Sequence, residues 1–76
     1  MKAGQSLPSP PESSTRYKVG DRVKCKMDQW EQGTIVQLWY REEFWETGFY
    51  APYQVLIDKG SLIWIPRDSK VFIKPV

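Results

Sequence analysis

The few residues left for a folded core constrain this chain more than any other feature of its sequence. The first fifteen residues, MKAGQSLPSPPESST, hold three prolines and four serines and almost no large apolar side chain. Such a segment buries too little surface to offset the entropy it would lose on folding. We therefore predict a disordered N-terminal arm over residues 1–15 and one folded domain over residues 16–76. A domain of about 60 residues is only marginally stable without reinforcement.

The usual reinforcements of a small domain are absent from the sequence. Cys25 is the only cysteine and there is no histidine, which excludes an internal disulfide and a zinc site of the common ligand types. Two reinforcements remain: a core dense in the four Trp, four Tyr and three Phe, or burial against a second copy of the chain. A lone thiol suits a reducing compartment. Neither a secretory signal nor a membrane-spanning run is found, so we expect a soluble, cytoplasmic protein.

The first two strands are predicted from side-chain alternation. Residues 22–27, RVKCKM, alternate basic and apolar side chains, which is typical of a half-buried strand. Residues 33–40, GTIVQLWY, are rich in the β-branched and aromatic side chains that strands favour. Their alternation slips, because the four large apolar residues of this run cannot all point one way; these are Ile35, Val36, Leu38 and Trp39. A β-bulge would reconcile this pattern with a strand.

Three shorter strands are predicted after an interruption. Residues 53–57 form one strand, and residues 58–61 form a hairpin turn with Gly60 in the left-handed conformation. Residues 62–65 form the next strand, and residues 71–73 form the last. No run has helical spacing, so the fold class is all-β. Closure removes unpaired edges, and we therefore predict an SH3-like five-stranded small barrel with a disordered N-terminal arm.

The last two predicted strands are apolar on both faces. A small barrel has one interior, so the second apolar face needs a cover, and we expect a second copy of the chain to supply it. This predicts a homo-oligomer. The expected interface residues are Ile63, Trp64, Ile65 and Phe72.

Residues for catalysis are scarce. Without histidine there is no imidazole base to activate a serine or a thiol. The alternation around Cys25 predicts a buried apolar side chain rather than a nucleophile. Glu42 and Glu43 are adjacent, so in an extended segment they point to opposite sides and are poorly placed to act together. No glycine-rich loop matches a phosphate cradle. We expect neither enzymatic activity nor a cofactor.

Aromatic residues are the strongest sign of function. The stretch LWYREEFWETGFYAPYQV, residues 38–55, holds seven rings in eighteen residues. Rings on the rim of a small barrel can stack on bases, enclose a methylated ammonium group or bind a proline-rich peptide. The same rings can instead fill a small core. We expect Trp39, Tyr40 and Tyr53 to close the core. The expected partner-binding residues are Trp30, Trp45, Phe49 and Tyr50.

Charge is distributed unevenly along the chain. The formal net charge is +2, with basic residues concentrated over 16–26 and acidic ones over 28–46. Alternating basic residues on a strand are ordinarily its solvated face. A nucleic-acid interpretation would have Lys24 and Lys26 contact phosphates beside the aromatic rings.

The residues from Trp30 onward, W-x-x-GTIVQLWYREEFWETGFYAPYQVLIDKGSLIWIP-x-D, cover about half of the chain. They resemble a small SH3-like, Tudor-like module of microbial and algal proteins, which occurs alone or beside ankyrin repeats and MYND-type fingers. The resemblance implies that residues 41–52 belong to the fold and are not an insertion. It implies no particular activity, because the module has none established.

A second, looser resemblance is carried by GDRVKCKMDQWEQGTIV, then WY, then GSLIWIP. These stretches are similar to the small plasmid- and integron-borne dihydrofolate reductase that confers trimethoprim resistance, in which four protomers surround a pore that binds folate and NADPH. Lys26 stands at the position of the family's functional lysine. The family's Gln-Ile-Tyr run is replaced here by Ile63, Trp64 and Ile65. The resemblance therefore implies an oligomer without the polar groups that hold the two ligands.

Together these observations predict a non-enzymatic SH3-like binding module with a protein or peptide partner, self-association and no membrane association. The second resemblance adds the expectation that the chain is the product of a mobile gene cassette. Two alternatives stay open. The chain is a nucleic-acid-binding small barrel, or it is an oligomeric reductase-like protein that has lost or altered its pore site.

Overall fold

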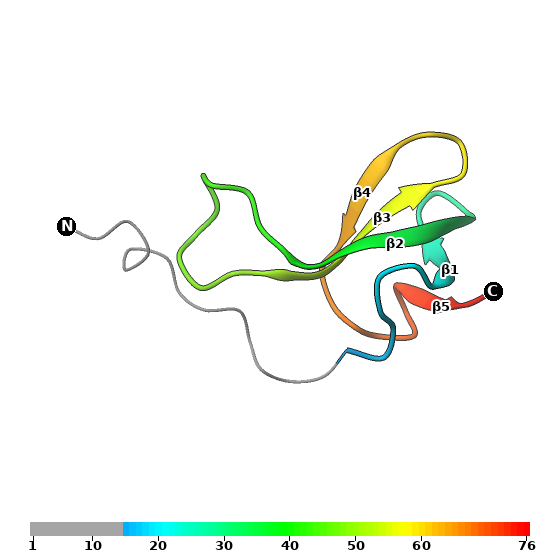
Figure 1. Cartoon of the computed structure of the whole chain (residues 1–76), viewed down its shortest axis with the longest axis horizontal. Helices are drawn as coiled ribbons and strands as arrows, with labels where there is room; N and C mark the ends of the chain where they lie inside the picture. Colours follow the sequence, from blue (N-terminus) through cyan, green and yellow to red (C-terminus); the bar gives the residue numbers. More distant parts are fainter. Residues whose placement is uncertain (1–14) are drawn as a thin grey trace.

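The structure, a computed structural model, describes residues 15–76, in which five antiparallel strands pair into one sheet (Figure 1). No helix occurs in that part of the chain. The all-β prediction is therefore confirmed. The predicted arm lies, except for Thr15, outside the described residues. The strands are β1 (Arg22–Lys26), β2 (Trp30–Tyr40), β3 (Ala51–Ile57), β4 (Leu62–Ile65) and β5 (Ile73–Pro75).

The predicted closure of the barrel is not observed. The strand order is β4-β3-β2-β1-β5, so β4 and β5 are the two ends of an open sheet. All five strands nevertheless contribute to one buried core, and the sheet therefore curls around that core without its ends pairing. The core side chains are Val23, Cys25, Ile35, Tyr53, Val55, Ile57, Ile65 and Ile73.

Alternation in β1 follows the prediction. Val23 and Cys25 are fully buried, while the basic side chains between and beside them point outward. The strand ends at Lys26, one residue earlier than predicted. Met27 belongs to the turn that follows and is 40% exposed. Its backbone N–H donates to the Gln29 carbonyl, which closes that turn.

The predicted bulge in β2 is confirmed. Ile35 pairs with Val55 and Gln37 pairs with Gln54, so Val36 is an extra residue on β2. The slip lets Ile35 and Leu38 both face the core, as their apolar character requires. The strand begins at Trp30, three residues earlier than predicted. Gly33 sits so close to β3 that an added Cβ would lie 2.6 Å from the Leu56 carbonyl oxygen.

The hairpin between β3 and β4 also follows the prediction. Gly60 has φ +109°, and its N–H donates to the Ile57 carbonyl at 2.7 Å. The N–H of Ile57 donates to the Ser61 carbonyl at 2.8 Å, which fixes the register of β4. β4 has the predicted bounds.

The last strand begins later than predicted. The N–H groups of Phe72 and Ile73 both donate to the Ser69 carbonyl at 2.9 Å, so residues 71–72 form a turn. β5 then runs along β1 only from Ile73 to Pro75. β5 pairs with β1 alone, so the sheet stays open between β5 and β4.

The segment before β1 is held against the core. Tyr53 is fully buried, and its hydroxyl accepts the N–H of Tyr17 at 3.1 Å. Burial raises the pKa of Tyr53 to about 12. Arg16 forms a salt bridge with Asp68 at 2.7 Å. These contacts join the chain before β1 to the connection between β4 and β5.

Candidate functional site

The loop between β2 and β3, residues 41–50, is organised by one side chain. The guanidinium of Arg41 donates to the carbonyls of Glu46 and Phe49 at 2.8 and 2.9 Å. It also donates to the Trp45 carbonyl at 2.8 Å, and it lies over the Tyr50 ring at 5.7 Å. The loop lacks regular secondary structure, and the hydrogen bonds from Arg41, its first residue, hold its backbone in place.

The loop packs an aromatic cluster against the outside of β4. Trp45 lies 5.6 Å from Tyr40, 5.0 Å from Phe49 and 4.7 Å from Trp64, measured between ring centroids. Such edge and tilted arrangements are favourable beyond the area they bury. We call these four residues the aromatic cluster. Trp64 was predicted to need cover from a second copy, and the chain's own loop covers part of it.

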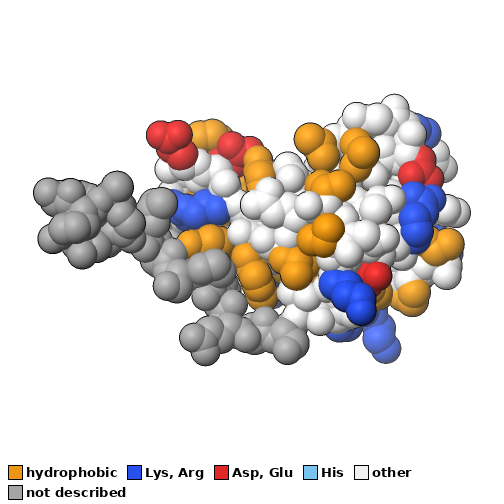
Figure 2. All heavy atoms as spheres, in the orientation of Figure 1, with side chains coloured by type: hydrophobic (Ala, Val, Ile, Leu, Met, Phe, Trp, Pro, Cys, Tyr) orange, Lys and Arg blue, Asp and Glu red, His pale blue; other side chains and the backbone are white. Residues whose placement is uncertain are grey.

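Part of the outer apolar face remains open. Leu56 and Leu62 are directly opposite each other on β3 and β4, and they are 41% and 60% exposed. Trp64, two residues further along β4, is 42% exposed. Figure 2 shows hydrophobic side chains across this face of the molecule, while most Lys and Arg side chains lie toward the end with β1 and β5. We call Leu56, Leu62 and Trp64 the apolar strip.

A groove of about 410 Å³ lies where the sheet fails to close. It brings together all four predicted interface residues, from β4 on one side and the turn before β5 on the other. Lys26, which the second resemblance singles out, lies at the same groove. We call it the seam groove. Its lining residues are Lys26, Met27, Asp28, Glu31, Ile63, Trp64, Ile65, Pro66 and Phe72.

Trp30 is separate from the aromatic cluster and lies among lysines. The Nζ of Lys74 is 4.4 Å from the centre of the Trp30 ring, and that of Lys26 is 5.6 Å away. Lys24 is directly opposite Lys74 in the pairing of β1 with β5. We call Lys24, Lys26, Lys74 and Trp30 the basic face. The sequence singled out three of its members, and it missed Lys74 because β5 was expected to end at residue 73.

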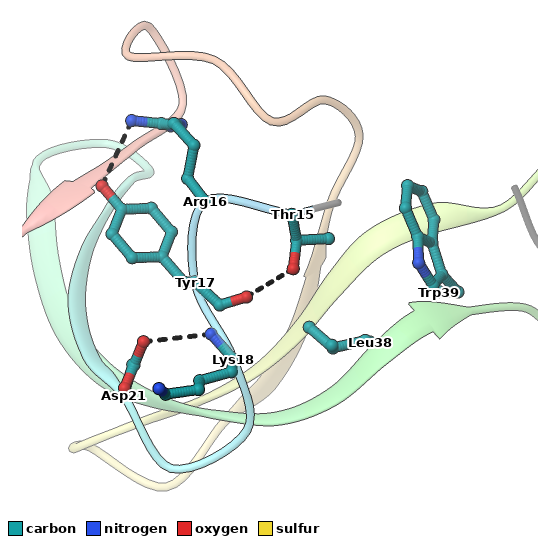
Figure 3. Close-up of a pocket in the computed structure, with 7 residues that line it drawn as sticks. All are labelled: Thr15, Arg16, Tyr17, Lys18, Asp21, Leu38 and Trp39. Carbon is teal, nitrogen blue, oxygen red and sulfur yellow. Dashed lines mark hydrogen bonds between the residues drawn. The ribbon is translucent and has the colours of Figure 1, made fainter. Parts of the chain in front are cut away.

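A second hollow of about 470 Å³ lies between the segment before β1 and the end of β2 (Figure 3). Leu38 and Trp39 are on one side, and residues 15–18 are on the other. Trp39 has φ +54°, which is rare for a bulky side chain. Trp39 was predicted to close the core, but its neighbour Leu38 packs against the core instead.

The described residues hold little that resembles catalytic chemistry. Cys25 is fully buried, and burial raises its pKa to about 11, so almost none of its thiol is ionised at neutral pH. Within residues 15–76, no group of three or more His, Cys, Asp or Glu is placed to hold a metal ion. The same part of the chain contains no helix able to cross a membrane.

Comparisons of the chain with protein family models, with curated proteins and with solved structures found no match. The class of the protein is therefore defined by its own geometry, which is a small all-β domain with an open, curled sheet. Its surface offers an apolar side at β4 and a basic side at β1 and β5.

Proposed function

We propose that this chain is a non-enzymatic interaction module that binds an extended segment of a protein partner along the free edge of β4. The proposal rests on one observation: β4 ends the sheet, and no strand of residues 15–76 pairs with its outer edge. Strand edges of this kind accept an added strand through backbone hydrogen bonds.

The register of β4 identifies the backbone groups available to a partner. Ile57 donates to Ser61, and hydrogen-bonded pairs alternate along an antiparallel ladder. Ile63 and Ile65 therefore exchange hydrogen bonds with β3. The N–H and C=O groups of Leu62 and Trp64 point away from β3, toward the position an added strand would take.

The surroundings of the edge suit an apolar partner. β4 has the sequence LIWI and carries no charged side chain and no internal proline, the features that ordinarily protect an edge from pairing. The seam groove lies on one side of this edge and the apolar strip on the other. Side chains of an added strand alternate between two faces, so one set would enter the groove and the other would cover the strip.

A second copy of the chain is the second candidate for the partner. The sequence LIWI is identical in two copies, and antiparallel pairing of β4 with β4 would be isologous. It would also cover the apolar strip, since each copy would bring its own Leu62 and Trp64 to the contact. Sedimentation velocity over a range of concentrations tests this candidate directly.

The test of the proposed edge uses two substitutions at one position. Leu62→Ala and Leu62→Pro both remove the exposed side chain, but only proline also removes the outward N–H. Proline is tolerated at the first residue of an edge strand when its N–H faces solvent. Peptides selected from a displayed random library on the wild-type chain are then titrated against both variants.

We expect Leu62→Pro to weaken binding of the selected peptides at least about ten-fold more than Leu62→Ala, because a backbone hydrogen bond of the added strand is lost. Circular dichroism should be unchanged in both variants. If a second copy is the partner, only the proline variant should sediment as a monomer at all concentrations. Equal binding by the two variants would contradict docking at the edge.

A further inference from the structure

Three lysines share one outward face of the sheet. Lys24 on β1 is directly opposite Lys74 on β5, and Lys26 follows two residues along β1. Like charges directly opposite each other in an antiparallel pair are destabilising. None of the three salt bridges within residues 15–76 includes any of these lysines. No carboxylate of residues 15–76 therefore forms an ion pair with these lysines, although Asp28 and Glu31 line the seam groove beside Lys26.

Other cations of the same sheet region do have carboxylate partners. Arg22, two residues before Lys24, donates from two nitrogens to the carboxylate of Asp58 at 2.7 and 2.6 Å. Lys59 pairs with Glu31 at 3.1 Å. Arg22 and Lys59 are thus each paired with a carboxylate, whereas Lys24, Lys26 and Lys74 form no salt bridge within residues 15–76.

An aromatic ring lies within this positive surface. Trp30 is directly opposite Lys26 in the pairing of β1 with β2. Lys74 also reaches the ring, with its Nζ 4.4 Å from the centroid. Cation–π contact holds the lysine side chains over the ring, but it leaves their charge available to an anion. Proteins that bind single-stranded nucleic acid use this combination of cations and a ring.

We propose that the basic face binds single-stranded nucleic acid, with the three lysines contacting consecutive phosphates and Trp30 stacking on a base. Lys24 and Lys26 are separated by about 6.6 Å along the strand, twice the rise per residue, a spacing comparable with that of adjacent phosphates in an extended strand. The three lysines lie on two neighbouring strands, β1 and β5, and the ring of Trp30 beside them suits an unpaired base, which a duplex does not offer. This proposal is argued from β1 and β5 and not from the β4 edge. Lys26 lies at both sites, because it also lines the seam groove, whereas Lys24 and Lys74 belong to the basic face alone.

The primary test is the salt dependence of binding to a fluorescein-labelled oligothymidylate, measured by anisotropy. Release of counterions by three phosphate contacts predicts that log K falls with log salt concentration with a slope of about −2. Replacing one lysine, as in Lys74→Gln, should make the slope shallower by about 0.7. The matched control is Lys59→Gln, which removes a paired lysine elsewhere and should leave the slope unchanged.

A stability measurement separates loss of binding from loss of folding. Lys74→Gln removes the repulsion with Lys24, so its Tm should rise while its affinity falls. Lys59→Gln loses an ion pair, so its Tm should fall slightly or stay the same while its affinity is kept. Trp30→Ala should weaken oligonucleotide binding roughly five-fold or more through lost stacking. Its effect on the salt slope should be small, because it carries no charge.

Three results would overturn the proposal. The first is no binding of the oligonucleotide even at low salt. The second is an unchanged slope when Lys24, Lys26 and Lys74 are all replaced by glutamine. The third is competition by inorganic tripolyphosphate as strong as that of unlabelled oligonucleotide at equal phosphate, together with wild-type affinity in Trp30→Ala. That last pair of results would mean a surface for anions in general rather than for nucleic acid.

Discussion

The aromatic cluster and the basic face both place tryptophan near a cation, but the two regions differ in what these side chains contact. In the cluster, the rings contact one another, and the guanidinium of Arg41 donates to three carbonyls of its own loop. On the basic face, the Trp30 ring lies beside two lysines, and the lysines of this face form no salt bridge within residues 15–76. A cation whose N–H donors are used by carbonyls of its own loop supports the fold. A cation that forms no salt bridge keeps its charge available to a ligand.

Both regions depend on β2. Its first residue, Trp30, belongs to the basic face, and its last, Tyr40, belongs to the aromatic cluster. The bulge at Val36 lies between them. Changes that damage β2 should therefore affect both regions, while changes confined to one region should leave the other intact.

The largest effect is expected for Gly33→Ala. The added Cβ would lie 2.6 Å from the Leu56 carbonyl oxygen and 2.8 Å from the Val55 side chain, so β2 and β3 must separate. Overpacking at such a contact costs about 3 kcal/mol or more, a large fraction of the stability of a small domain. Urea unfolding should show a destabilised chain in which both regions are lost. Gly20→Ala is the control, because its Cβ would meet nothing within 4 Å and only its left-handed φ costs about 1 kcal/mol.

Trp45→Ala should affect the aromatic cluster alone. The substitution removes ring contacts with Tyr40, Phe49 and Trp64, and we expect a loss of about 2 kcal/mol in the free energy of unfolding. Phe44 is the matched control, because it is in the same loop but is 81% exposed. Phe44→Ala should stay within about 0.5 kcal/mol of wild type. If both variants lose equal stability, the cluster does not support the fold.

Arg41→Lys tests whether geometry rather than charge holds the loop. Lysine keeps the positive charge but lacks the planar fork that reaches three carbonyls. We expect a loss of about 1–2 kcal/mol and faster hydrogen exchange in residues 41–50. Arg67→Lys, on the exposed connection before β5, is the control and should change neither. Unchanged exchange in Arg41→Lys would mean that ring packing alone fixes the loop.

The smallest effect on the free energy of unfolding is expected from the ion pair of Asp68 with Arg16. It is compared with the lysines of the basic face, which form no salt bridge within residues 15–76. Burial alone would raise the pKa of Asp68, but hydrogen bonds from the backbone and side chain of Arg16 outweigh it and hold the pKa below its ordinary value of 3.8. A carboxyl with a depressed pKa stabilises the fold above the unfolded value, and this contribution is lost as pH falls through the folded pKa.

Asp68→Asn should therefore be less stable than wild type at pH 7, by about 0.5–1 kcal/mol because the pair is partly exposed. The difference should disappear in acid, as pH falls through the lowered pKa of Asp68 in the folded chain. Lys74→Gln leaves this ion pair intact, so it should differ from wild type by the same amount at both pH values. Denaturant titrations at the two pH values measure both differences, and a gap for Asp68→Asn that persists in acid would contradict the assigned ion pair.

Local sequence patterns predicted much of the fold and less of the site. Alternation in β1, the slipped alternation of β2 and the glycine of the β3–β4 turn each have a local physical cause, and all three were predicted correctly. Of a closed or a nearly closed barrel, full closure is not observed. The late start of β5 was not predicted, because it depends on two N–H groups that share the Ser69 carbonyl. Backbone hydrogen bonds of this kind do not alter the pattern of apolar residues, so they cannot be predicted from that pattern.

The path of the aromatic loop was equally hard to predict. The contact between Trp45 and Trp64 follows from carbonyls that Arg41 happens to reach, and those carbonyls are the same in every residue type. The residues expected to form a partner-binding rim therefore differ in exposure. Trp45 packs within the cluster, and Phe49, at the border of the cluster, is 38% exposed. Lys24, Lys26 and Trp30 were accessible to sequence reasoning because strand register alone brings them together.

The extra residue at Val36 means that the curvature of this sheet is set by a count of residues rather than by the identity of any one of them. A three-nucleotide deletion there would keep every pairing of β2 with β3 on both sides and yet straighten the strand. A flatter form of this sheet is thus one codon away, without any change in the side chains that line the interior.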